Sequence, residues 1–530
     1  MENNKFDLKA VLAIGLGLFI WLGWQLYLNK KYPKANAAAV STATPNTPDL
    51  AAKSTSEQNK DPNLVTSKET SKPINAPAKT FEYETDSVKF TLSSLGMGIS
   101  NYSLKDYKDH SGHDILMSNG TSNDDGLFAM KLPQVGLLPF EVAEKGPGYF
   151  VGTARVGGLT ISRELKFHSD TRSFESRISF SGADDSFRNG FSLIIPGKLD
   201  EQKKSSFLMP SYDHQDFVVS HLEKTETIML SNRKESLSEE RKTSRLVSFG
   251  SQYFAVASLD KSELLPDVKL IADVNSRKTL AEINYKPLQI RPDMQFSQVF
   301  YAGPKSVEKL RGIDPELPSL VDFGWLGFIA SPLVKLLRVL FDLVGNWGWA
   351  IVLLTLVVRL FVLPFNIMST RSMKAMQRIQ PQMQALRERY KEDPMTLNKE
   401  MMTLMKESGA NPFGGCLPML LQIPIFFALY RVIGSSVELY QSPFFGWITD
   451  LSAHDRFYVF PVLMGIAMFL QQKMTPTTMD PAQAKIFAFM PLIFTVFMLQ
   501  LPSGLTVYML VSAVFGIIQQ YIMLRDAKKA

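Results

Sequence analysis

The sequence predicts a polytopic α-helical membrane protein that carries a large all-β domain outside the membrane. Long uncharged apolar runs lie near the N-terminus and through the last third of the chain, whereas apolar and polar residues alternate strictly in the region between. The 530 residues are too many for one ordinary domain. A hydrophobic content of 45% suits a chain that is partly soluble and partly embedded in a bilayer.

The N-terminal run, Val11–Leu28, has 18 uncharged residues and is followed by Lys30 and Lys31. Because this length can cross a bilayer, we predict an uncleaved signal-anchor helix over residues 1–32. The small residues Ala35-Asn36-Ala37 leave a cleaved signal peptide as the alternative. Residues 33–80 contain no aromatic residue and are rich in Ser, Thr, Ala, Pro and Lys, which predicts a disordered tether.

Residues 81–318 alternate with a period of two, as in Val88/Phe90/Leu92 and Ile178/Phe180, with Gly, Asn and Asp between the runs. This pattern predicts an antiparallel β-sandwich. The following stretch, 319–346, contains Lys335, Arg338 and Asp342 at helical spacing among Leu, Val and Phe. So narrow a polar stripe predicts an amphipathic helix in the membrane interface, with a core helix of the β domain as the alternative.

Five further apolar segments predict a helical core over 347–524, so that the chain would have six transmembrane helices in all. A polar insert over 366–412 carries eight Lys or Arg, whereas loop 434–456 carries only Arg456. The positive-inside rule therefore predicts that the insert, the short tail 525–530 and both termini are cytoplasmic and that the β domain is not. The five segments are Trp347–Phe365, Cys416–Ile433, Phe457–Leu470, Ile486–Leu501 and Gly504–Leu524.

The insert has apolar residues at helical spacing on both sides of Glu392-Asp393-Pro394, which predicts a helical hairpin over 371–411. Its surface is basic, and Arg387 and Arg389 are candidate residues for docking a substrate or the translation machinery. A purely structural hairpin is the alternative.

Catalytic signatures such as HExxH, the P-loop and GxSxG do not occur in the sequence. We therefore predict no enzyme activity, no catalytic residue, no metal site and no cofactor. The only cysteine, Cys416, rules out an intrachain disulfide. A net charge of +6 without a long basic block argues against direct DNA binding.

Arg359 lies thirteen residues into an apolar segment that begins at Trp347. A guanidinium at such a depth is costly unless it faces protein or water. Thr355 lies on the same helical face, and Gln422 is a polar residue in the next segment. Together with Gln519 and Gln520 near the end of the chain, these residues predict a wet groove. An arginine that snorkels to the interface is the alternative.

The motifs NPFGGCLPMLLQIPIFFALY (411–430), QKMTPTT (472–478) and LPSGLTVY (501–508) resemble those of the YidC family of membrane protein insertases, and the resemblance extends over 346–524. The anchor, the tether and a β domain with YAGPK (301–305) resemble the Gram-negative branch. The resemblance implies a five-helix core in the inner membrane, a periplasmic β-sandwich and a groove that is open to the cytoplasm and to lipid. Where the family is expected to have a tyrosine pair, this chain has Tyr508-Met509, and the resemblance places both residues in the substrate groove with Arg359, Thr355 and Gln422.

The resemblance further implies an insertase and chaperone that works without ATP chemistry of its own. The implied partners are nascent membrane proteins, the lipid bilayer, the Sec translocon and the ribosome. Two other functions remain open from the residues. A transporter could bind an anion at Arg359, and a membrane-anchored protein could bind or modify carbohydrate with its β domain.

Overall fold

The computed structural model describes the chain from residue 78 to residue 529, with internal gaps. The predicted signal-anchor and nearly all of the predicted tether therefore lie outside the described residues. The gaps are 110, 119–125, 134, 183–189, 201–213, 222–223, 232, 287–294, 409–416 and 475–487.

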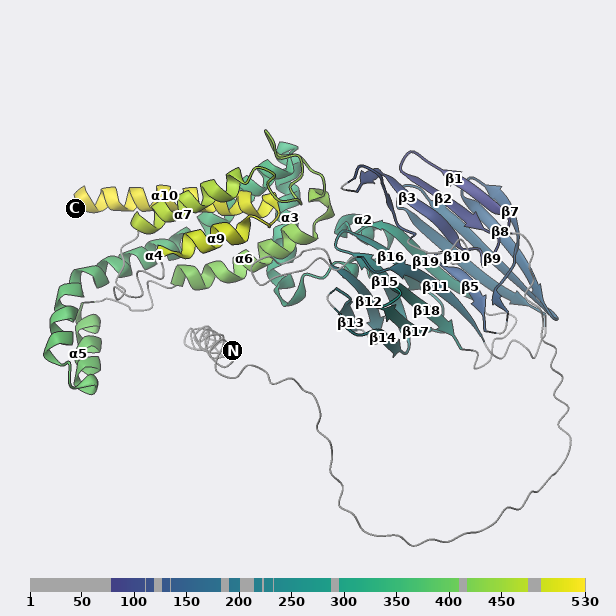
Figure 1. Cartoon of the computed structure of the whole chain (residues 1–530), viewed down its shortest axis with the longest axis horizontal. Helices are drawn as coiled ribbons and strands as arrows, with labels where there is room; N and C mark the ends of the chain where they lie inside the picture. Colours follow the sequence, from purple (N-terminus) through teal and green to yellow (C-terminus); the bar gives the residue numbers. More distant parts are fainter. Residues whose placement is uncertain are drawn as a thin grey trace, which may run out of the picture. The chain divides into compact units, whose positions relative to one another are not determined.

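The predicted all-β domain is confirmed, and it consists of three antiparallel sheets (Figure 1). The first has the order β1-β2-β3-β4, and its strands are Thr80–Glu84, Val88–Ser93, Ile99–Lys108 and Asp114–Leu116. Sequence-adjacent strands are neighbours throughout this sheet, as expected when short turns join alternating runs.

The second sheet has nine strands in the order β13-β12-β15-β16-β19-β10-β9-β8-β7. In that order its strands are Lys224–Met229, Gln215–His221, Ser244–Ser251, Phe254–Asp260, Gln295–Pro304, Ser173–Ser181, Leu159–His168, Tyr149–Val156 and Glu141–Gly146. The third sheet has the order β14-β17-β18-β11-β5-β6. Its strands are Leu237–Arg241, Asp267–Asp273, Lys278–Tyr285, Phe191–Lys198, Ala129–Leu132 and Gly136–Leu137.

The nine-stranded sheet is covered on both faces. One face contributes Phe174 and Phe296 to the main core, in which Phe191 and Tyr285 of the third sheet also lie. The other face packs on α2 (Val307–Ile313) and the short helix η2 (Leu317–Leu320). Because both faces are covered, all seven residues of β16 are buried, and this strand shows no alternation of burial.

An arginine is enclosed in the β domain. Arg163 has no exposed surface, and its guanidinium donates to the carbonyl oxygens of Gly96 at 2.6 Å and Phe128 at 2.8 Å. It also lies 5.8 Å from the centre of the Phe300 ring. Burial lowers the pKa of Arg163 to about 9. The guanidinium thus links β9 to two chain segments that are far from it in the sequence.

The loop after α6 (Leu417–Ser435) packs into the β domain. Val437 belongs to the main β core, and the hydroxyl of Tyr440 donates to the carbonyl oxygen of Lys108 at 2.7 Å. The Tyr440 ring also contacts the rings of Tyr253 and Phe254, at centroid distances of 5.2 and 5.5 Å. This loop therefore couples a core helix directly to the β domain.

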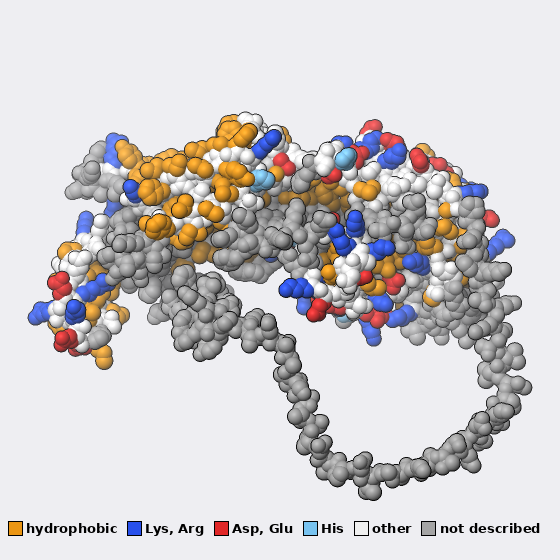
Figure 2. Space-filling model, in the orientation of Figure 1, with side chains coloured by type: hydrophobic (Ala, Val, Ile, Leu, Met, Phe, Trp, Pro, Cys, Tyr) orange, Lys and Arg blue, Asp and Glu red, His pale blue; other side chains and the backbone are white. Residues whose placement is uncertain are grey.

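The remaining helical elements follow one another from the end of the β domain to the C-terminus. They are η3 (Gly324–Leu326), α3 (Gly327–Val344), α4 (Trp347–Arg389), α5 (Pro394–Glu407), η4 (Val437–Leu439), α7 (Val459–Met474), α9 (Met490–Met498) and α10 (Ser503–Lys529). By length and composition, two of the described helices could cross a membrane, within Trp347–Arg389 and Ser503–Met523. The hydrophobic surface over the helices in Figure 2 agrees with a membrane environment.

The change from apolar to polar residues at Asn366 does not end the helix. We expected an apolar segment over Trp347–Phe365 followed by a separate insert, but α4 continues without interruption for 43 residues. It passes through Pro364 and Pro381 and ends at Arg389. The helix continues because the helical spacing of apolar residues persists beyond Asn366. The change in polarity there affects the surroundings of the helix but not its backbone geometry.

Loop 434–456 and its continuation to α7 form a compact cap on the helical core. Asp455 is 1% exposed, and its carboxylate accepts from the indole of Trp447 and from the backbone N–H groups of Phe457 and Phe460, at 2.8 to 3.0 Å. Gly348 at the start of α4 packs so closely that an added Cβ would lie 2.0 Å from the Phe444 ring. This end of the core is therefore tightly filled.

Replacing Asp455 tests how firmly this cap is held. Asp455→Ala leaves three donors, one of them buried and two part-buried, without their acceptor and should lower the free energy of unfolding by about 2–4 kcal/mol. Asp455→Asn keeps one acceptor oxygen and should lose less. Thermal unfolding of the full chain in detergent, followed by tryptophan fluorescence, measures both. Equal melting temperatures for wild type and Asp455→Ala would contradict this role.

Candidate functional site

Arg359 lies well inside the apolar part of α4. It is about 18 Å along the axis from Trp347, at a rise of about 1.5 Å per residue. The side chain is half-buried, and its neighbours Leu360 and Phe361 are 58% and 76% exposed. The guanidinium therefore borders a surface that is otherwise apolar, at a depth near the middle of a bilayer about 30 Å thick.

Two polar side chains from other helices form a hydrogen bond, and one of them lies near Arg359. Gln422 of α6 donates from its Nε2 to the hydroxyl oxygen of Tyr508 of α10 at 2.6 Å. Tyr508 is 1% exposed and is close enough to Arg359 for an electrostatic interaction. Tyr508 thus lies near Arg359 and is bonded to Gln422, and we call these three residues, which come from three helices, the Arg359 cluster.

In the part of the chain that the structure describes, no carboxylate forms an ion pair with Arg359. The sequence offers no nearby acid either, because α6, α7 and α9 contain no Asp or Glu and α4 contains none before Glu388. The positive charge is therefore available to a carboxylate or a polar group that comes from outside the chain.

A second polar layer lies closer to the hairpin. Asn366 of α4 is 8% exposed and donates to Gln519 of α10 at 3.5 Å. Lys374 donates to the carbonyl oxygen of Met523 at 2.8 Å, and Gln520 donates to that of Met474 at 3.1 Å. The predicted polar residues Gln519 and Gln520 thus serve contacts between helices in this layer and do not join the Arg359 cluster.

The other two predicted groove residues have different surroundings. Thr355 is fully buried, and its hydroxyl donates to the carbonyl oxygen of Ile351 in its own helix at 2.7 Å. Met509 is half-buried and packs against the apolar core of the helices. The structure therefore groups Arg359, Gln422 and Tyr508, and it does not bring Thr355 and Met509 into the same polar contact.

Sequence reasoning missed the buried polar residues of the second layer. Asn366, Ser369 and Thr370 are 8%, 1% and 4% exposed. They continue the stripe of Thr355 and Arg359 along one side of α4, at intervals of three, four or seven residues. Extending that stripe past Phe365 could have found them.

The hairpin consists of the end of α4 and of α5. The two arms meet through Met376 and Ile379, which are buried, and through half-buried Leu404 and Met405. Asp393 caps α5 by accepting from the backbone N–H groups of Met395 and Thr396 and from the Thr396 hydroxyl. The hydrogen bond from that hydroxyl is the main reason why the pKa of Asp393 is lowered.

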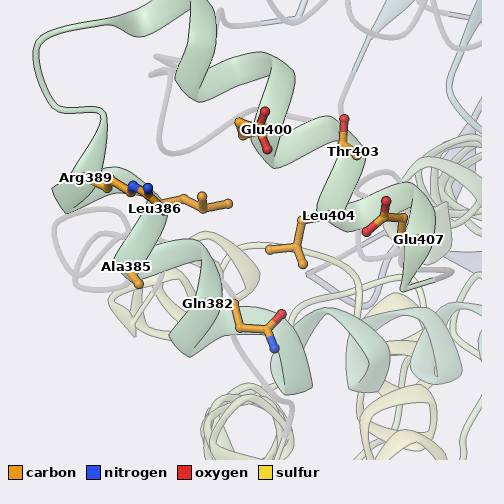
Figure 3. Close-up of a pocket in the computed structure, with 8 residues that line it drawn as sticks. All are labelled: Gln382, Ala385, Leu386, Arg389, Glu400, Thr403, Leu404 and Glu407. Atoms are coloured by element: carbon orange, nitrogen blue, oxygen red, sulfur yellow. The ribbon is translucent and has the colours of Figure 1, made fainter.

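A pocket of about 380 Å³ opens between the two arms (Figure 3). Arg389 lines it, whereas Arg387 is exposed and does not. The two arginines predicted as one docking element therefore have different surroundings. The residues that line the pocket are Gln382, Ala385, Leu386, Arg389, Glu400, Thr403, Leu404 and Glu407.

Comparison with known proteins identifies the family of the chain. The family model described as YidC periplasmic domain matches residues 80–336, and the one described as 60Kd inner membrane protein matches residues 339–530. A relative named membrane protein insertase YidC, from Campylobacter jejuni subsp. jejuni serotype O:2, is 36% identical over 397 residues. The match covers 74% of this chain and 71% of the relative. The chain belongs to the YidC family of membrane protein insertases.

The resemblance drawn from the sequence motifs is therefore confirmed, and the family models describe an inner membrane protein with a periplasmic domain. One solved structure is an active YidC insertase with its first transmembrane domain resolved, at 20% identity and a TM-score of 0.38, covering 84% of this chain and 94% of that chain. Another is a putative aldose 1-epimerase from Escherichia coli K12, at 8% identity and a TM-score of 0.30, covering 43% and 99%. At these scores neither likeness assigns a fold or an activity.

The bond between Gln422 and Tyr508 can be tested by a double-mutant cycle. Tyr508→Phe and Gln422→Leu each leave one polar group unpaired, and their coupling should be about 0.6–1.7 kcal/mol, as for other hydrogen bonds between membrane helices. Tyr521→Phe, on the exposed side of α10, is the matched control and should show no coupling to Gln422→Leu. Unfolding of the full chain in mixed micelles provides the measurement, and additive effects of Tyr508→Phe and Gln422→Leu would contradict the bond.

Proposed function

We propose that this chain inserts apolar segments of nascent membrane proteins into the inner membrane and that the Arg359 cluster receives their polar residues. The observation that carries this proposal is a guanidinium that has no carboxylate partner in the described part of the chain, beside an exposed apolar surface. A polar or acidic residue of an incoming segment loses its hydration on entering a bilayer. Contact with the half-buried Arg359 and Gln422, which Tyr508 holds in place through its bond to Gln422, would offset part of that loss while the apolar residues enter lipid.

The proposed topology has both termini in the cytoplasm, six spans with five in the core, and the β domain in the periplasm. It assigns the anchor to 1–32, the tether to 33–80, the β domain to 81–318, the interfacial helix to 319–346 and the core to 347–524. The exposed Lys335 and Asp342 of α3 support an interfacial helix, since the opposite side, with Leu337 and Leu340, packs into the core. The hairpin 371–411 and the tail 525–530 would be cytoplasmic.

The proposed partners are nascent membrane proteins, lipids, the Sec translocon and the ribosome. Arg387 is the residue of the hairpin best suited to contact ribosomal RNA, because its side chain is exposed and, unlike Arg389, does not line the pocket. The proposed mechanism is positioning and partitioning without a catalytic step, so it assigns no catalytic residue, metal or cofactor.

Charge at position 359 can be separated from polarity by substitution. Arg359→Lys should preserve insertion of single-span clients that have an acidic translocated segment, whereas Arg359→Ala should slow it by roughly fivefold or more, since it removes the intramembrane cation. Arg371→Ala, an exposed arginine farther along α4, is the matched control. Insertion into proteoliposomes at equal protein abundance measures the effect. Equal rates for Arg359→Ala and Arg359→Lys would show that the charge is dispensable.

Labelling of single cysteines tests the topology. In a Cys416→Ser background, an impermeant thiol reagent applied to intact spheroplasts should modify Lys145→Cys in the β domain and Thr449→Cys in the loop before α7. Asn398→Cys on the exposed side of α5 should react only after the membrane is opened. Labelling of Asn398→Cys in intact spheroplasts would refute the cytoplasmic placement of the hairpin.

A further inference from the structure

The pocket between the hairpin arms is a second polar site, distinct from the Arg359 cluster. Leu386 of α4 and Leu404 of α5 point toward one another across it in Figure 3 and form its apolar floor. Its rim is polar, with Glu400 and Glu407 on α5 and Arg389 on α4. A volume of about 380 Å³ is enough for a few side chains of a docked segment.

The two arms are packed unevenly. Near the membrane-spanning part of α4, Met376 and Ile379 are buried between the arms. Near the tip, Leu386 and Leu404 are only half-buried, and Ala385 is exposed. Two amphipathic helices therefore leave part of their shared apolar surface uncovered at the pocket. A third helical segment laid along the groove would cover it, as in a three-helix coiled coil.

The charges of the rim indicate what this segment carries. Glu400 and Glu407 are two helical turns apart, about 10 Å along the axis. Neither takes part in an ion pair among the described residues. Arg389 stacks on Tyr390, with its guanidinium 5.6 Å from the ring centre. The rim thus has two carboxylates and one guanidinium, a net negative charge that favours a cation over a phosphate.

We propose that this pocket binds the basic, amphipathic flank of an incoming membrane segment, with Lys or Arg residues two turns apart and an apolar residue between them. The inference rests on the proposed function. According to the positive-inside rule, membrane segments have Lys and Arg in their cytoplasmic flanks, and the hairpin is also proposed to lie on the cytoplasmic side. The cations would meet Glu400 and Glu407, and the apolar residue would contact Leu386 and Leu404.

Site-specific photocrosslinking of the full chain tests the proposal. A photoreactive residue at Thr403 lines the pocket, and one at Lys399 lies outside it. The clients are stalled single-span nascent chains that have either two Lys or two Gln in the cytoplasmic flank. Crosslinking from Thr403 should be roughly threefold or more stronger for the Lys client than for the Gln client, whereas crosslinking from Lys399 should not distinguish them.

Charge variants supply the matched control. Glu400→Gln/Glu407→Gln should lower the Thr403 crosslink of the Lys client to the level of the Gln client. Glu388→Gln/Glu392→Gln removes the same charge from exposed positions outside the pocket and should leave that crosslink unchanged. Glu400→Lys/Glu407→Lys should instead favour a client with two Glu in its flank.

Several results would overturn the pocket proposal. They are equal crosslinking of the Lys and Gln clients from Thr403, an equal effect of both double-Gln variants, or crosslinks from Thr403 to ribosomal RNA or lipid alone. Insertion of the same clients in proteoliposomes separates this failure from that of the proposed function. Normal insertion with no charge dependence at Thr403 would reject the pocket alone, whereas no insertion would reject the proposed function.

Discussion

The need to hold one cation inside an apolar bundle constrains the helical core of this protein. An arginine near the centre of a membrane helix costs about 2.5–3.5 kcal/mol on insertion scales, so its surroundings must be polar or wet. Here Tyr508 of α10 lies near Arg359 and accepts a hydrogen bond from Gln422 of α6. Among the described residues the guanidinium has no anionic partner. The arrangement lowers the cost of the charge without neutralising it. That residual attraction is what the proposed insertion mechanism uses.

The two ends of the helical bundle are held together by different kinds of contact. At the end near loop 434–456, aromatic rings and the fully used carboxylate of Asp455 fill the space between helices. Toward the hairpin, Asn366 and Gln519 meet in a polar contact at 3.5 Å, close to the limit of a hydrogen bond. The two ends of the bundle thus differ in chemistry, with aromatic packing at one end and polar contacts between helices at the other.

Most of the fold could be predicted from the spacing of apolar residues, because a helix or strand that buries one face has apolar residues at regular intervals. The strands that contain Val88 and Ile178, the helix with Arg338 and the arms on either side of Asp393 all followed from spacing. The uninterrupted α4 did not, since we took a change in polarity for the end of an apolar segment. The polarity of the residues indicates the medium around a helix, whereas the spacing of its apolar residues indicates whether the backbone is helical.

Contacts between residues far apart in the sequence could not be predicted. Arg163 looks like an exposed strand residue until the carbonyl oxygens of Gly96 and Phe128 are in place around it. Likewise, nothing in a loop residue such as Val437 shows that it completes the core of another domain. In the candidate site, Arg359 could be identified from its position thirteen residues into an apolar segment, and Tyr508 from the resemblance to the family. The bond between Gln422 and Tyr508 depends on how α6 and α10 pack, which a single sequence does not encode locally.

Helix α4 links the two proposed binding sites and gives them opposite charge. Arg359 and Leu386 lie on the same helix, about 40 Å apart along its axis at the usual rise per residue. One site presents a cation inside the membrane, and the other presents two carboxylates on the hairpin. A segment with a basic flank and a polar or acidic leading end would match both sites in one orientation and oppose both in the other. If each site contributes even a modest preference, their combination on one continuous helix would help to set the direction of insertion before the segment enters lipid.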